Sequence, residues 1–154
     1  PAKEEDAEFT AEALEAMYEA TAGYPYFVQA YGKTAWDVAP RSPITADDVR
    51  VAAPEAEAEL AVGFFGSRFE RATPAEREYL RAMADVMDAE GGAMDDPDAT
   101  ASTADVAKVL GRRAQSLSPA RDALIKKGLV YSGERGRIAF TVPHFGRYLR
   151  RHGD

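Results

Sequence analysis

The C-terminal third of the chain carries side chains of the types that bind nucleic acid. Arginine and lysine neutralise phosphates, and glutamine and serine form hydrogen bonds with base edges. Between positions 112 and 137 such residues fall into three groups: two arginines in the turn before a predicted helix, a set with helical spacing, and two arginines around a glycine-containing turn. They predict a nucleic-acid-binding surface made of Arg112, Arg113, Gln115, Ser118, Lys126, Arg135 and Arg137.

The helical group runs from Gln115 to Lys126 with the spacing i, i+3, i+7 and i+11, which places its members along one side of a helix. Asp122 belongs to the same side and disfavours phosphate because its carboxylate is negative. Lys126 and Lys127 have an alternative role, since cations near the C-terminus of a helix interact favourably with its dipole. For Arg121 the alternative is an ion pair within the helix or at the edge of the core.

The charge of the chain is strongly polarised, although the net charge is only −7. Residues 1–102 carry 8 Lys and Arg against 22 Asp and Glu, a net charge of −14. Residues 103–154 carry 11 Lys and Arg against 4 Asp and Glu, a net charge of +7. An acidic whole argues against nonspecific binding to polyanions, whereas the basic third favours a local anion-binding face. Solvation of one end of the molecule is the alternative explanation.

Two short helices and a hairpin must position these side chains. The first helix ends at Gly111, and the second begins near Ser116, which caps it, with Pro119 in the first turn. Two strands follow on either side of the glycine-containing turn 133–136, at residues 129–131 and 137–142. This order predicts a winged helix-turn-helix, with the second helix as the recognition helix and the hairpin as the wing.

Three helices with short loops are expected before this domain, as a small bundle. Thr10 and Thr45 cap the first and the third helix, and Pro25 begins the second. Pro54 is expected to interrupt or restart the third helix. A capping box with proline, beginning at Thr73, opens the first helix of the C-terminal domain.

The composition changes near residues 71–73, which predicts a helical bundle at residues 1–71 and the winged helix-turn-helix domain at residues 72–154. The fold class is therefore mainly α with a small β wing. Residues 88–102 are rich in Gly, Asp and Ala without periodicity, and are expected to form a mobile loop.

The sequence contains no recognisable arrangement of catalytic residues. There is no cysteine, no phosphate-binding loop with Lys-Ser or Lys-Thr, and no ligand cluster around His144 and His152. We expect no metal site and no enzyme activity in this chain.

No apolar run approaches the roughly 20 residues of a membrane helix, so we expect no membrane partner and a cytoplasmic location. Because the chain begins at Pro1 and continues with an acidic run, we expect it to be a piece of something longer.

Three features together resemble the C-terminal lid and winged helix of P-loop ATPases of the AAA+/STAND class: the segment Gly23-Tyr24-Pro25-Tyr26-Phe27, the three-helix bundle, and the winged helix that ends in Ile138-Ala139-Phe140-Thr141-Val142-Pro143. The resemblance covers nearly the whole chain, and residues 111–143 are its more specific part. The resemblance implies a parent protein that uses ATP or ADP, with the nucleotide-binding core upstream. It implies that Pro25 approaches the nucleotide base. Some AAA+ lids have a sensor arginine where this chain has Tyr26, so the resemblance does not extend to that function.

The leading hypothesis is a C-terminal regulatory region of an ATPase whose winged helix binds duplex DNA. The alternative is an interaction module that packs on the ATPase core or on a neighbouring subunit. A third hypothesis is a free-standing transcription regulator with a ligand pocket lined by Tyr18, Phe27, Tyr31 and Trp36.

Overall fold

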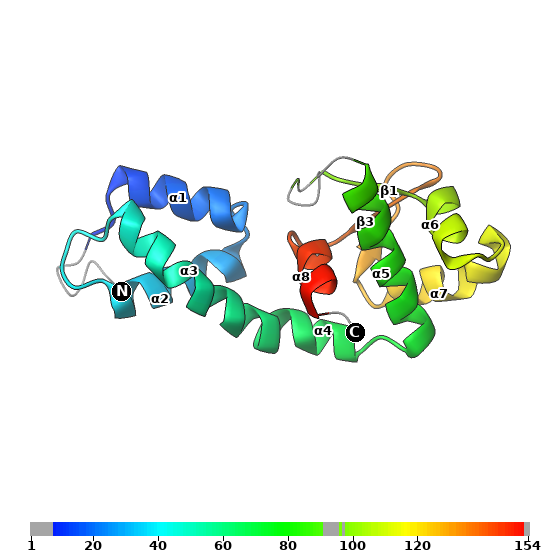
Figure 1. Cartoon of the computed structure of the whole chain (residues 1–154), viewed down its shortest axis with the longest axis horizontal. Coiled ribbons are helices and arrows are strands. Elements are labelled where there is room, and N and C mark those ends of the chain that lie inside the picture. Colours follow the sequence, from blue (N-terminus) through cyan, green and yellow to red (C-terminus); the bar gives the residue numbers. More distant parts are fainter. Residues whose placement is uncertain (1–7, 91–95, 97, 153–154) are drawn as a thin grey trace. The chain divides into compact units, whose positions relative to one another are not determined.

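The computed structural model describes residues 8–90, 96 and 98–152 (Figure 1). The fold is mainly helical with a small three-stranded antiparallel sheet. The chain forms two compact units, Pro1–Phe64 and Phe65–Asp154, and each is described by itself. Within the described ranges, none of the helices combines the length and the apolarity that crossing a membrane requires.

The first unit is a three-helix bundle of α1 (Ala11–Thr21), α2 (Pro25–Val38) and α3 (Ala46–Leu60). The expected caps are confirmed: the Thr10 side chain accepts from the amide of Ala13, and Thr45 forms a capping box with Asp48. Helix α3 packs against both other helices. The core contains Ala13, Met17, Phe27, Tyr31, Ala35, Val49, Ala52, Ala56 and Leu60.

One expectation about this unit is wrong. Pro54 does not interrupt α3, because Ala52 and Ala56 are fully buried on either side of it and packing holds both halves in one helix. Of the residues expected to line a ligand pocket in the third hypothesis, Tyr18 is 67% exposed, whereas Phe27 and Tyr31 are core residues.

The units divide between Phe64 and Phe65, earlier than the expected boundary at residue 71. Helix α3 leads into a π-helical turn, η1 (Ala61–Phe65), and then into α4 (Gly66–Glu70). Phe65 stacks on Tyr148 with ring centroids 5.3 Å apart, and Phe69 meets the same ring edge-on. These aromatic contacts place α4 in the second unit.

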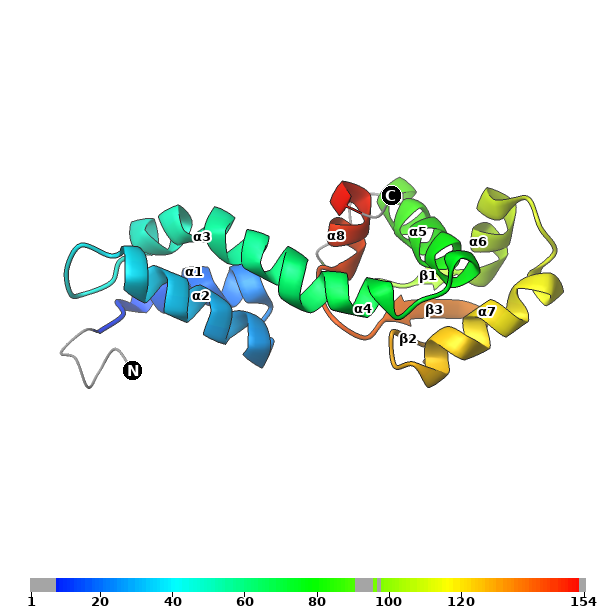
Figure 2. The ribbon, with the colours of Figure 1, turned by 90° about the horizontal axis from the view of Figure 1, so that it is seen from below.

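In the second unit, α5 (Pro74–Ala89) packs against α6 (Thr103–Leu110), α7 (Ala114–Lys126) and α8 (Phe145–His152) (Figures 1 and 2). The sheet has the order β1 (Ala101–Ser102), β3 (Arg137–Phe140), β2 (Val130–Tyr131), and both pairings are antiparallel. In the hairpin Val130 pairs with Phe140 and Tyr131 with Ala139, as the glycine-containing turn predicted. The core contains Leu80, Met83, Val106, Leu124, Leu129, Val130, Ile138 and Phe145.

Two details of this unit differ from the expectations. Helix α7 begins at Ala114 rather than near Ser116, whose hydroxyl donates to the carbonyl of Arg113 at 2.7 Å and does not cap the helix. Pro119 therefore lies inside α7, beyond the first turn. The two ends of the expected loop contain structure, because α5 extends to Ala89 and β1 occupies residues 101–102, while residues 91–95 and 97 of that segment lie outside the described residues.

Candidate nucleic-acid interface

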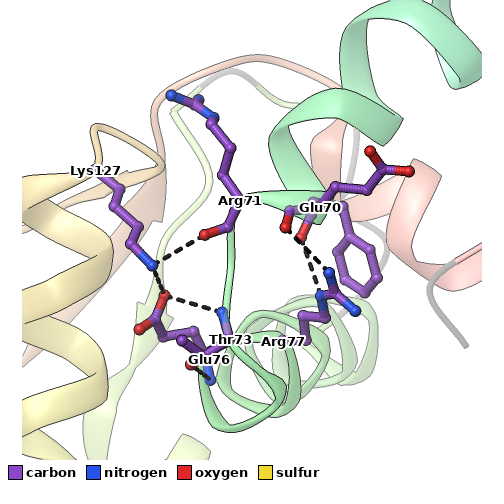
Figure 3. A network of polar contacts seen from close by, with 7 residues as sticks. Glu70, Arg71, Thr73, Glu76, Arg77 and Lys127 are labelled. Atoms are coloured by element: carbon purple, nitrogen blue, oxygen red, sulfur yellow. Dashed lines mark hydrogen bonds and ion pairs between the residues drawn. The ribbon is translucent and has the colours of Figure 1, made fainter.

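A polar network fixes the end of α7 against the start of α5 (Figure 3). The Lys127 ammonium, just after α7, lies 2.5 Å from the Glu76 carboxylate and 3.0 Å from the carbonyl oxygen of Arg71. Glu76 also completes the expected capping box, since its carboxylate accepts from the Thr73 amide and its amide donates to the Thr73 hydroxyl. The ion pair between Lys127 and Glu76 thereby holds the C-terminal end of α7 against α5.

The Glu76 side chain is only 8% exposed, so the state of its carboxylate affects folding. Burial alone would raise its pKa, but the hydrogen bonds from Lys127 and Thr73 outweigh burial and leave the pKa below its usual value of 4.5. The charged form therefore belongs to the folded state. Lys127 has a structural role in this network, beyond the dipole interaction considered from the sequence.

The turn before α7 presents two cations. Gly111 caps α6 in the left-handed conformation, with φ of 63°, as the sequence predicted. Arg112 and Arg113 follow, and both are exposed. Among the described residues, neither guanidinium has a hydrogen-bond or ion-pair partner, so the fold leaves both charges in solvent.

The exposed face of α7 differs in one position from the predicted one. Gln115, Asp122 and Lys126 are exposed as expected, but Ser118 is half-buried. Leu117 is buried on the opposite side of α7 from these residues' solvent face, and the exposed positions between Gln115 and Asp122 are Ser116 and Pro119. Arg121 forms the expected intrahelical contact, 3.5 Å from Asp122.

The hairpin separates its two arginines. Arg135 lies in the turn, is exposed, and has no side-chain partner within the described part of the chain. Arg137 instead donates to the hydroxyl and the carbonyl of Thr100 at 2.9 and 3.1 Å, and lies 3.6 Å from Glu90. The Arg137 guanidinium thus connects the segment before β1 to β3. Its position beside other cations in the hairpin did not predict this structural role.

Two further exposed side chains of the second unit were not among the residues predicted from the sequence to bind nucleic acid. Lys108 on α6 is exposed, and Tyr131 at the end of β2 is 44% exposed. Lys108 was detectable from the sequence as a further cation, six positions before the first residue of α7. Tyr131 was counted only as a strand residue, although the alternation with the buried Val130 directs it out of the core.

Pro25, the residue that the resemblance places beside a nucleotide, lies in the first unit. It is exposed at the first position of α2 and lines a shallow depression with Tyr24, Tyr26 and Gln29. None of these four side chains is a cation, so they offer surface for a base but no partner for phosphates.

Comparison with known proteins gives one family. The family described as Domain of unknown function (DUF8462) matches residues 62–149, and the chain belongs to this family. The matched region includes all the elements from α4 to β3 and most of α8, so it covers most of the second unit, including the candidate interface. No curated protein matches the chain.

Proposed function

We propose that the second unit is a winged helix-turn-helix domain that binds duplex DNA. In this proposal α7 enters the major groove as the recognition helix, α6 supports it, and the β2–β3 hairpin is the wing. The order of these elements and the packing of α6 and α7 on α5 support the assignment. We place the protein in the cytoplasm, together with its DNA partner.

One observation carries the proposal: three arginines before and after α7 in the sequence make no side-chain contact that stabilises the described fold. Arg112 and Arg113 precede the helix, and Arg135 lies in the hairpin turn; none has a side-chain partner among the described residues. The fold uses other cations of the same unit, since Lys127 binds Glu76 and Arg137 binds Thr100. Unpaired guanidiniums at the helix start and the wing are suited to phosphates on both sides of a groove.

The proposal is tested by fluorescence anisotropy of the chain with a labelled duplex of random sequence, titrated from low to physiological salt. Each contacted phosphate contributes about −0.9 to the slope of log K against log salt. Three arginines therefore predict binding at low salt with a slope of about −3 or steeper. Absence of binding even at low salt would contradict the proposal.

A second candidate, binding to an ATPase core or to a neighbouring subunit, is favoured by exposed apolar side chains. Val109 on α6 is 53% exposed, Ile125 on α7 is 38% exposed, and Tyr131 on β2 is 44% exposed. Apolar area contributes more to protein contacts than to phosphate contacts. In this case the anisotropy titration finds no duplex binding, and the cations of the unit meet an acidic protein surface.

We further propose, from the resemblance to AAA+/STAND ATPases, that the first unit serves as the lid of such an ATPase. The depression lined by Tyr24, Pro25, Tyr26 and Gln29 then contacts the base of ATP or ADP, and this chain itself has no enzyme activity. Because the lining contains no cation, we expect adenosine to shift the NMR signals of Tyr26 and Gln29 as strongly as ADP does. Signals that stay unchanged at millimolar adenosine would argue against the lid assignment.

A further inference from the structure

The exposed face of α7 contains one carboxylate that the fold does not use. Asp122 has a 63% exposed side chain, and its partner in the described part of the chain is the neighbouring Arg121, at 3.5 Å. An exposed pair of this kind contributes little to stability. Asp122 caps no helix, and in the described structure it bonds to no other element, so packing and capping do not explain this charge.

Asp122 is also unfavourable for binding to phosphate. It lies on the same side of α7 as Gln115, Pro119 and Lys126, with Arg112 and Arg113 just before the helix. A negative charge on this face opposes the attraction that these cations provide. If α7 binds DNA as proposed, a carboxylate on this face is favourable only where it accepts a hydrogen bond. In DNA the bases offer such donors, whereas the phosphates repel a carboxylate.

The position of Asp122 along the helix is consistent with a base contact. Asp122 follows Gln115 by two helical turns, about 10 Å along the axis at 1.5 Å per residue. This rise corresponds to about three base steps at 3.4 Å per step. If Gln115 reaches the base edges at one end of the contact, Asp122 reaches a different base pair in the same groove.

The chemistry of the major groove then selects one base. A carboxylate accepts hydrogen bonds and donates none. Cytosine presents the N4 amino group as a donor, whereas adenine places the N7 acceptor beside its amino group, and guanine and thymine present acceptors. We infer that Asp122 is a specificity-determining residue that reads a cytosine through its N4 amino group. This inference rests on the proposed DNA binding by α7.

The test is selection of binding sites from a randomised duplex library by the full chain, compared with the Asp122→Asn and Asp122→Ala variants. The wild type should enrich cytosine at one position, by roughly tenfold over other bases. Asp122→Asn should move the preference at that position toward adenine, since an amide can both donate to N7 and accept from N6. Asp122→Ala should lose the preference while binding random duplex as tightly as the wild type or more tightly.

The matched control is Glu78→Gln, which removes one exposed carboxylate from α5 and should leave the selected sequence unchanged. If Asp122→Asn selects the same base as the wild type and only binds all sequences more tightly, Asp122 acts through repulsion and the inference is wrong. A wild-type chain that binds duplex without any preference at such a position also overturns it. A chain that binds no duplex overturns the proposed function as well.

Discussion

Replacing Lys127 by glutamine is expected to lower the free energy of unfolding of the second unit by about 3 kcal/mol at neutral pH, because it leaves a buried carboxylate without its cation. Glu76 is 8% exposed and Lys127 is 32% exposed, so the pair is shielded enough for the loss to exceed that of a surface ion pair. The variant also removes the hydrogen bond to the Arg71 carbonyl, which joins the turn before α5 to the end of α7.

The effect of Lys127→Gln should depend on pH in a defined direction. In the wild type, the lowered pKa of Glu76 means that its charged form stabilises the fold above the usual value of 4.5, and this contribution is lost as the pH falls through the folded-state pKa. Without Lys127 the carboxylate is buried with only the Thr73 hydrogen bonds. The difference in stability between wild type and variant is therefore largest near neutrality and shrinks in acid, where Glu76 is protonated in both.

Urea denaturation monitored by hydrogen exchange of peptides from α5 and α7 measures this effect in the second unit. Lys126→Gln is the matched control, because Lys126 is exposed and its replacement should change stability by about 0.5 kcal/mol or less. The double variant Glu76→Gln with Lys127→Gln should recover part of the loss, since it leaves no unpaired charge. Equal destabilisation by the two lysine replacements would show that Glu76 does not depend on Lys127.

The sequence predicted the elements whose signals are local. Thr10, Thr45 and Thr73 bind the helix starts that follow them, and Gly111 ends α6 with a positive φ, so each boundary is decided by a few neighbouring residues. The start of α7 was missed because Arg113 provides no side-chain cap, and Ser116 resembled one. Local signals therefore give the right boundary only where the cap forms.

The remaining features depend on partners that are distant in the sequence. Strand β1 has two residues and no periodicity, and it exists because Ala101 pairs with Ile138. The candidate interface shows the same limit: charge and spacing selected Arg135 and Arg137 together, but only Arg137 meets Thr100, 37 positions away. Composition predicts where cations gather, and the tertiary structure decides which of them remain available.

Replacing Arg112, Arg113 and Arg135 together by alanine is expected to reduce the affinity for duplex DNA by roughly a hundredfold at low salt, without unfolding the second unit. The guanidiniums have no side-chain partners among the described residues, so their loss removes charge from the surface and leaves the core untouched. The slope of log K against log salt should become shallower by about 3, since each lost phosphate contact contributes about 1. Anisotropy at several salt concentrations measures both quantities.

The matched control replaces Arg41, Arg50 and Arg71 by alanine, three exposed arginines outside the proposed surface. Both triple variants lower the net charge from −7 to −10, the wild-type value less three, so a general electrostatic effect would weaken both equally. Specific loss in the first variant locates the phosphate contacts at the start of α7 and in the wing. Equal loss would assign the binding to total charge, whereas unchanged affinity of the first variant would remove these arginines from the interface. Arg137 is not replaced in this test because the loss of its hydrogen bonds to Thr100 would lower the stability of the fold as well as the affinity for DNA.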